Sequence, residues 1–170
     1  MEDKELAVLT YRKVKEEILY NLPLQWADVE TTERTKRGHC GSKAELLGHK
    51  LSSMGYAVRY VIGYRVGILP KFLRPKFLDV HIWVETYIDG SWLTLDPTPD
   101  SEVASIVGDT EPGTHQGEPE YTLRVDELTP MFKDVYNSWC TLHYRIIFNI
   151  GLAVVRRIVR IKQRRKMGKA

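Results

Sequence analysis

The chain has 170 residues, of which 43% are hydrophobic, 10% aromatic and 28% charged. A globular chain of this length buries about 70% of its unfolded surface, and the composition excludes a disordered protein. Its two cysteines, Cys40 and Cys140, exclude a multi-disulfide secreted scaffold and a zinc site built on paired cysteines. The sequence therefore predicts one globular domain with a core of its own.

The N-terminal residues favour a cytoplasmic protein. The segment MEDKELAVLTYRKVKEE is charged from its second residue and has no apolar run of the signal-peptide kind. The low cysteine content is typical of a reducing compartment. We therefore expect a cytoplasmic protein, with peripheral membrane contact as an option for its basic C-terminal end.

Positive charge is concentrated near the C-terminus, although the net charge of the chain is only +3. The remainder carries 17 basic and 22 acidic side chains, so its net charge is about −5. A basic segment on an acidic body favours contact with an anionic partner through that segment. Its eight basic residues, with no acid among them, are Arg156, Arg157, Arg160, Lys162, Arg164, Arg165, Lys166 and Lys169.

Two helices are expected in the N-terminal third. Apolar residues at helical spacing predict a helix within residues 4–20, and Pro23 ends the pattern. Residues 22–38 have no clear hydrophobic period and are predicted as a loop. A second helix is expected to begin at or beside Cys40 and to stop at Gly55, because one apolar stripe follows the cysteine: Ala44, Leu47, Leu51 and Met54.

Three strands are expected next, at residues 56–66, 79–88 and 91–96, because these runs are rich in β-branched and aromatic residues. A proline-containing loop over 67–78 connects the first two strands. Asp89-Gly90 separates the last two and is the signal for a two-residue type I′ hairpin loop.

The hairpin loop predicts a register. It places these residues opposite each other: Ile88 and Ser91, Trp83 and Asp96, His81 and Thr98. His81 and Asp96 then become diagonal neighbours on one face, roughly 7 to 8 Å apart at the backbone. An imidazole and a carboxylate can meet at that distance.

The rest of the chain divides into two parts. Residues 97–120 are acidic and turn-rich, so they are predicted as a surface excursion. From about Val125 the pattern is helical and ends in an amphipathic run, with Ile147, Ile150, Val154, Ile158 and Ile161 on one side and Arg156, Arg157, Arg160 and Arg164 on the other. The basic face of this C-terminal helix has three interpretations: a solvated face of a packed helix, a contact with a membrane surface or nucleic acid, or an oligomer interface. Without stacking aromatics, sequence-specific nucleic-acid binding is not expected.

Cys40 is a candidate nucleophile, because a helix N-terminus and an adjacent imidazole both favour the thiolate. His81 is the candidate base, and Asp96 the carboxylate that orients it. Gly41 and the Cys40 amide are placed to serve a substrate or an oxyanion. Each residue also has a structural interpretation: a buried thiol, a core histidine and a turn aspartate.

Two segments, KRGHCGSKAELLGHKLSSMGYAVRYVIGYR and DVHIWVETYIDGSWLTLDPT, resemble the core of the transglutaminase-like superfamily. The resemblance covers about residues 10–99 and implies a small, single-domain, prokaryotic-type member. It implies a papain-like α+β fold in which the helix that carries Cys40 packs on an antiparallel sheet that carries His81 and Asp96. We expect a catalytic domain over 1–125 and a basic helical extension over 126–170.

The resemblance implies a Cys40-His81-Asp96 triad that transfers an acyl group from a peptide or amide through a thioester, without a cofactor or metal. Hydrolysis is expected ahead of transamidation, because water is always present whereas transamidation needs an amine site. Trp26 is similar to a tryptophan that helps to bind the oxyanion in some members. His39, Gly41 and Trp83 are further candidates for oxyanion or substrate contacts.

Other residues receive structural interpretations. Cys140 is expected to be a buried thiol, and Lys43 and Arg59 surface or scaffold charges. Three histidines lack the spacing of metal ligands: His49, His115 and His143. An alternative of another class is a catalytically silent binding module docked on a membrane or another polyanion by its basic tail, through Arg156, Arg157, Arg160, Arg164 and Arg165.

Overall fold

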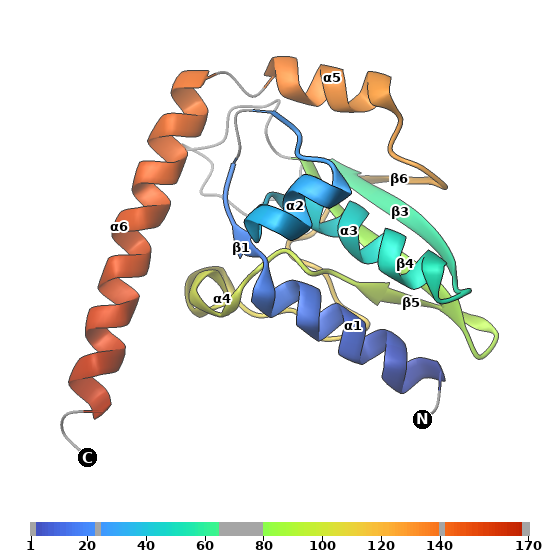
Figure 1. Cartoon of the computed structure of the whole chain (residues 1–170), viewed down its shortest axis with the longest axis horizontal. Helices are drawn as coiled ribbons and strands as arrows, with labels where there is room; N and C mark the ends of the chain where they lie inside the picture. The colour runs from blue at the N-terminus through green and yellow to red at the C-terminus, as the bar shows by residue number, and fades with distance from the viewer. Residues whose placement is uncertain (1–2, 23–24, 65–79, 140–141, 168–170) are drawn as a thin grey trace.

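The structure is a computed structural model that describes residues 3–22, 25–64, 80–139 and 142–167. It has an α+β fold in which a four-stranded antiparallel sheet, in the order β5-β4-β3-β6, carries helices on one face (Figure 1). The elements in chain order are α1 (Asp3–Glu17), β1 (Leu19–Tyr20), α2 (Val29–Thr35), β2 (Arg37–Gly38), α3 (Cys40–Ser53), β3 (Ala57–Tyr64), β4 (Val80–Ile88), β5 (Ser91–Leu95), α4 (Ser101–Val107), β6 (Tyr121–Val125), α5 (Pro130–Trp139) and α6 (Leu142–Met167).

The hairpin register predicted from the sequence is confirmed. Ile88 lies opposite Ser91, and the ladder between β4 and β5 runs as far as Val84 opposite Leu95. Asp89 and Gly90 have φ values of 52° and 79°, the positive values that a type I′ loop requires. Regular pairing ends at Leu95, so the two pairs expected beyond it lie outside the ladder.

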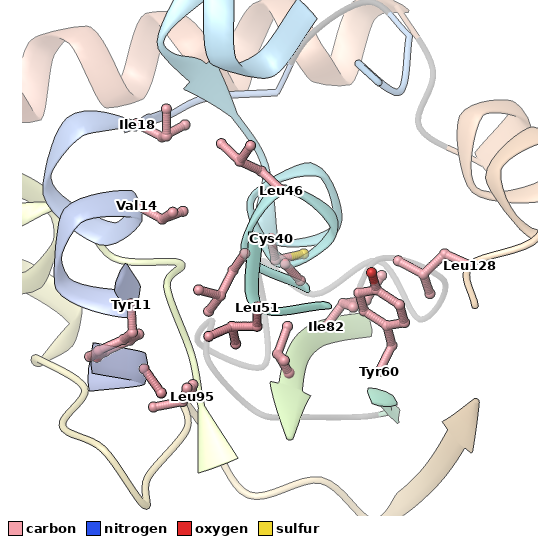
Figure 2. Close-up of a cluster of buried hydrophobic side chains, with 14 of the residues drawn as sticks. Tyr11, Val14, Ile18, Cys40, Leu46, Leu51, Tyr60, Ile82, Leu95 and Leu128 are labelled. Carbon is pink, nitrogen blue, oxygen red and sulfur yellow. The ribbon is translucent and has the colours of Figure 1, made fainter. Parts of the chain in front are cut away.

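The core lies between α3, α1 and the sheet. Alternate residues of β3 and β4 face α3, because successive side chains of a strand point to opposite faces. Figure 2 shows the Cys40 side chain inside this cluster, beside the α3 backbone. The buried cluster includes Tyr11, Val14, Ala44, Leu47, Leu51, Ile62, Ile82, Val84 and Leu95.

The prediction of a loop over 22–38 was wrong for part of that segment. It contains α2, which Asp28 caps by accepting a hydrogen bond from the Thr31 backbone N–H at 2.7 Å, and β2, which pairs in parallel with β1. The helical pattern was invisible because only Thr32 of α2 is buried. The expected first helix also ends earlier, at Glu17, where the chain turns into β1.

The prediction of a surface excursion over 97–120 was also wrong. The segment contains α4 and buries four polar side chains, those of Thr98, Asp100, Thr110 and Gln116. Hydrogen bonds tie this segment to distant parts of the chain: the Tyr11 hydroxyl donates to the Thr110 carbonyl at 2.6 Å, and the Tyr20 N–H donates to Asp100 Oδ2 at 2.7 Å. Composition suggested exposure because it does not reveal such partners.

Lys43 is a scaffold charge and is fully buried. Its ammonium donates to three backbone carbonyls, those of Lys15 at 3.1 Å, Ile18 at 2.5 Å and Thr98 at 3.1 Å. Burial lowers the pKa of Lys43 to about 7. The side chain therefore ties the first turn of α3 to the end of α1 and to the chain just after Asp96.

The C-terminal segment is helical, as expected, and consists of α5 and α6. Within the described ranges, we find no helix with both the length and the hydropathy of a membrane span. The expected loop over 67–78 and Cys140 lie outside the described residues.

Replacing Lys43 with Met should lower the free energy of unfolding by about 3 kcal/mol, because three buried carbonyls lose their donor. Lys50→Met is the matched control on the same helix: its ion pair with Glu33 is partly exposed, and its loss should cost less than about 1 kcal/mol. Urea unfolding followed by circular dichroism measures both. Equal losses in the two variants would contradict the bracing role of Lys43.

Candidate active site

Cys40 is the first residue of α3, as the sequence predicted. His39 forms the N-cap: its Nδ1 accepts a hydrogen bond from the Gly41 N–H at 3.0 Å, and its own N–H donates to Ser42 Oγ at 3.0 Å. This reciprocal capping fixes the start of the helix next to the sulfur. The partial positive charge of the helix N-terminus therefore acts on Cys40 and favours its thiolate.

His81 and Asp96 meet as the hairpin register implied. His81 lies near the start of β4, Asp96 follows the last residue of β5, and His81 Nε2 lies 2.7 Å from Asp96 Oδ2. An ionised carboxylate only accepts hydrogen bonds, so Nε2 carries the proton. Nδ1 is then the ring nitrogen that remains for the thiol.

Asp96 is held by two further hydrogen bonds. Its Oδ1 accepts from the Thr98 N–H at 3.0 Å, and its Oδ2 accepts from the Gln116 N–H at 2.9 Å. Complete burial raises the pKa of Asp96, but the charge of His81 and these donors outweigh burial and lower it. The carboxylate is therefore ionised at neutral pH.

The thiol and the imidazole shift each other's protonation. Burial raises the pKa of the Cys40 thiol, but the neighbouring imidazoles of His39 and His81 outweigh it, so the net shift is downward. Burial lowers the pKa of His81, but the Asp96 carboxylate and Cys40 outweigh it, so the net shift is upward. These opposite shifts favour a thiolate next to an imidazolium, the ionic form in which a cysteine attacks carbonyls.

Trp26 and Gly41 lie against each other beside Cys40. A Cβ atom at Gly41 would come within 2.1 to 2.8 Å of the Trp26 ring, so only glycine leaves room for the indole. The indole N–H donates to Glu45 Oε2 at 2.8 Å. In this arrangement Trp26 directs its donor at Glu45, and the Gly41 N–H is engaged by His39.

His39 belongs to an aromatic cluster that the sequence did not reveal. Its ring stacks on Tyr136 of α5, with centroids 5.0 Å apart, and meets Trp26 edge-on at 4.6 Å. Phe132, also on α5, packs edge-on against Trp26 at 6.0 Å. The amphipathic pattern of α5 was the only sequence signal that this helix packs on the body. Such a pattern does not show which surface the helix covers. The side chain of His39 is buried, and its Nε2 has no hydrogen-bond partner among the described residues.

Trp83 packs against the ring of His81. Its ring lies 5.7 Å from that of His81 and stacks on His115, with centroids 4.2 Å apart and planes 16° from parallel. Its indole N–H finds no partner in the part of the chain that the structure describes. Trp83 thus supports the imidazole by packing, and His115, from the segment expected at the surface, completes the stack.

The described residues contain no group of three acidic, histidine or cysteine side chains placed to hold a metal ion. His49 lies exposed on α3, away from the candidate triad. Cys40, His81 and Asp96 are each at most 3% exposed. The thiol, the imidazole and the carboxylate are therefore largely shielded from solvent in this structure.

Solved structures similar to this chain include two proteins with low sequence identity. One is described as a candidate protease from Parabacteroides distasonis, at 16% identity and a TM-score of 0.46, and the match covers 58% of this chain and 21% of that one. The other is described as a TGase, at 14% identity and a TM-score of 0.48, covering 71% of this chain and 30% of that one. The chain thus spans less than a third of either relative. A search of curated proteins finds no match.

The family assignment comes from the sequence itself. The family model described as the transglutaminase-like superfamily matches residues 1–97, more than half of the chain. The matched range contains Cys40, His81 and Asp96, the three residues that the fold brings together. The chain belongs to the transglutaminase-like superfamily.

Proposed function

We propose that this protein is a cysteine-dependent acyl-transfer enzyme that cleaves a peptide or amide bond through a thioester on Cys40. The observation that carries the proposal is the buried hydrogen bond between His81 Nε2 and Asp96 Oδ2, beside a thiol at a helix N-terminus. Residues 1–125 would form the catalytic domain, and residues 126–170 an extension of it. Cytoplasmic localisation stays a prediction from the sequence.

In the proposed first half-reaction, the Cys40 thiolate attacks the carbonyl carbon and a tetrahedral oxyanion forms. The C–N bond then breaks as the His81 imidazolium donates its Nδ1 proton to the leaving amine or ammonia. A thioester and a neutral imidazole remain. Asp96 keeps the proton on Nε2 throughout, so that Nδ1 alone exchanges protons with the reactants.

In the second half-reaction, His81 takes a proton from water, the hydroxide attacks the thioester, and a carboxylic acid leaves as the thiolate is restored. An amine in place of water would give transamidation by the same residues. The backbone N–H of Cys40, at the start of α3, is the donor that we assign to the oxyanion.

The rival proposal is a silent binding module. The ionic arrangement of the triad argues for an enzyme, because a module has no use for a buried carboxylate that orients an imidazole toward a thiol. The burial of Cys40 is the feature that would favour the module, if no condition opened the site.

The Cys40 thiolate should persist below the ordinary thiol pKa of about 8.5. In a Cys140→Ser background, ultraviolet thiolate absorbance should titrate at low pH and move up toward the ordinary value in His81→Ala. His81→Gln serves as a second variant, because its amide can still bond Asp96 and preserve folding, which circular dichroism checks. Identical thiolate titrations with and without His81 would contradict the proposal that His81 activates the thiol.

A proteome-derived peptide library with an added primary amine distinguishes the reactions. Mass spectrometry reads new peptide termini, glutamine converted to glutamate, and glutamine joined to the amine. Cys40→Ala should lower whichever conversion occurs by at least about 1000-fold. His49→Ala, on the same helix but exposed, should leave it unchanged. If every variant matches the wild type, the conversion does not come from this site.

With a substrate identified, Trp26→Phe separates packing from oxyanion binding. The Trp26 N–H is engaged by Glu45, so its loss should reduce kcat by much less than the roughly 100- to 1000-fold typical of an oxyanion donor. A loss in that larger range would mean that the indole turns from Glu45 to the oxyanion during the reaction.

A further inference from the structure

The helix α6 places its polar residues against the rest of the protein. The Asn149 side chain accepts from the Leu22 N–H at 3.0 Å and donates to the Leu22 carbonyl at 2.7 Å. Arg156 pairs with the buried Asp100, and Arg160 pairs with Glu102. Hydrogen bonds and ion pairs therefore help to hold the inner side of this helix against the body.

The outer side of α6 is apolar. Its aliphatic residues recur every three or four positions, so they share one face of the helix, opposite the contacts to the body. Figure 1 shows α6 as a long helix at the margin of the molecule. The outer stripe consists of Ile146 (47% exposed), Ile150 (60%), Val154 (54%), Ile158 (47%) and Ile161 (44%). This is the reverse of an ordinary surface helix, whose apolar face is turned inward.

Positive charge accompanies the outer stripe. The helix has no acidic residue between Leu142 and Met167. Arg156 and Arg160 are neutralised by α4, but Arg157 and Arg164 are exposed and lie along the edge of the stripe, about three and five turns beyond Ile146. The face thus combines aliphatic side chains with cations that the described part of the body does not neutralise.

We propose that α6 docks on an anionic bilayer surface, with the outer stripe in the headgroup boundary and Arg157 and Arg164 against lipid phosphates. Interfacial helices have this composition and bury their apolar face about 5 to 10 Å deep. A second copy fits less well, because joining two stripes would bring both sets of arginines together without an acid on either helix. Nucleic acid offers phosphates but nothing for five aliphatic side chains. The docking is independent of the proposed reaction.

Cosedimentation of the full chain with vesicles tests the proposal. The protein should bind vesicles of phosphatidylcholine and phosphatidylglycerol, and should not bind vesicles of phosphatidylcholine alone. The double variant Ile150→Asp with Ile158→Asp should weaken binding by at least about 100-fold, because two buried isoleucines are lost. Met131→Asp is the control, since Met131 is a 76% exposed apolar residue outside α6 and should be replaceable without effect.

The cationic contribution is tested separately. Arg157→Ala with Arg164→Ala should weaken binding roughly 30-fold at low salt, since each basic residue near an anionic surface contributes about fivefold. Lys4→Ala with Lys13→Ala, both exposed on α1, should leave binding unchanged. Circular dichroism confirms that each variant keeps its helices.

Three results would overturn the proposal. The first is that folded protein does not bind anionic vesicles at all. The second is binding that the stripe variants leave intact. The third is a dimer in light scattering that dissociates in the Ile150→Asp and Ile158→Asp variant, which would assign the outer stripe to a second copy of the chain.

Discussion

The buried, ionised carboxylate of Asp96 is the feature on which the rest of the structure depends. Asp96 is fully buried, and an ionised carboxylate in such a place is stable only when its oxygens are satisfied and a positive charge lies near. His81 supplies the charge, and backbone N–H groups of Thr98 and Gln116 supply the remaining hydrogen bonds. The segment over 97–120 therefore folds back on the hairpin rather than into solvent.

A buried lysine supports the placement of the triad. Lys43 lies one helical turn after Cys40 and donates to the Thr98 carbonyl, two residues after Asp96. Its other two acceptors belong to the end of α1. One ammonium thus fixes the nucleophile's helix relative to the residue that orients the base. Precise placement of catalytic groups depends on supporting contacts of this kind.

The C-terminal helices are bound to this core in two different ways. The helix α5 contributes Tyr136 and Phe132 to the aromatic cluster beside His39 and Trp26, so it lies next to the candidate site. The helix α6 is attached through ion pairs and a side-chain amide, and its outer stripe stays exposed. The helix α5 therefore combines aromatic packing with polar contacts to Trp26 and Glu45, whereas α6 makes polar contacts with the body and keeps its outer stripe exposed.

The sequence by itself determined the start of α3 at Cys40, the Asp89-Gly90 hairpin and the proximity of His81 to Asp96, because these depend on local signals: a capped apolar stripe, a turn dipeptide and the two-residue period of strands. The helix α2 escaped prediction because its residues carry little hydrophobic periodicity. The strand β6 escaped prediction although Tyr121, Leu123 and Val125 alternate with polar residues, because it is a short run of five residues that directly follows a turn-rich segment. Only the tertiary structure decided the burial of Lys43, the return of residues 97–120 to the site and the outward turn of the aliphatic face of α6. Each of these depends on contacts with residues far away in the chain. The residue pattern of one segment does not reveal which distant groups will form hydrogen bonds or ion pairs with that segment.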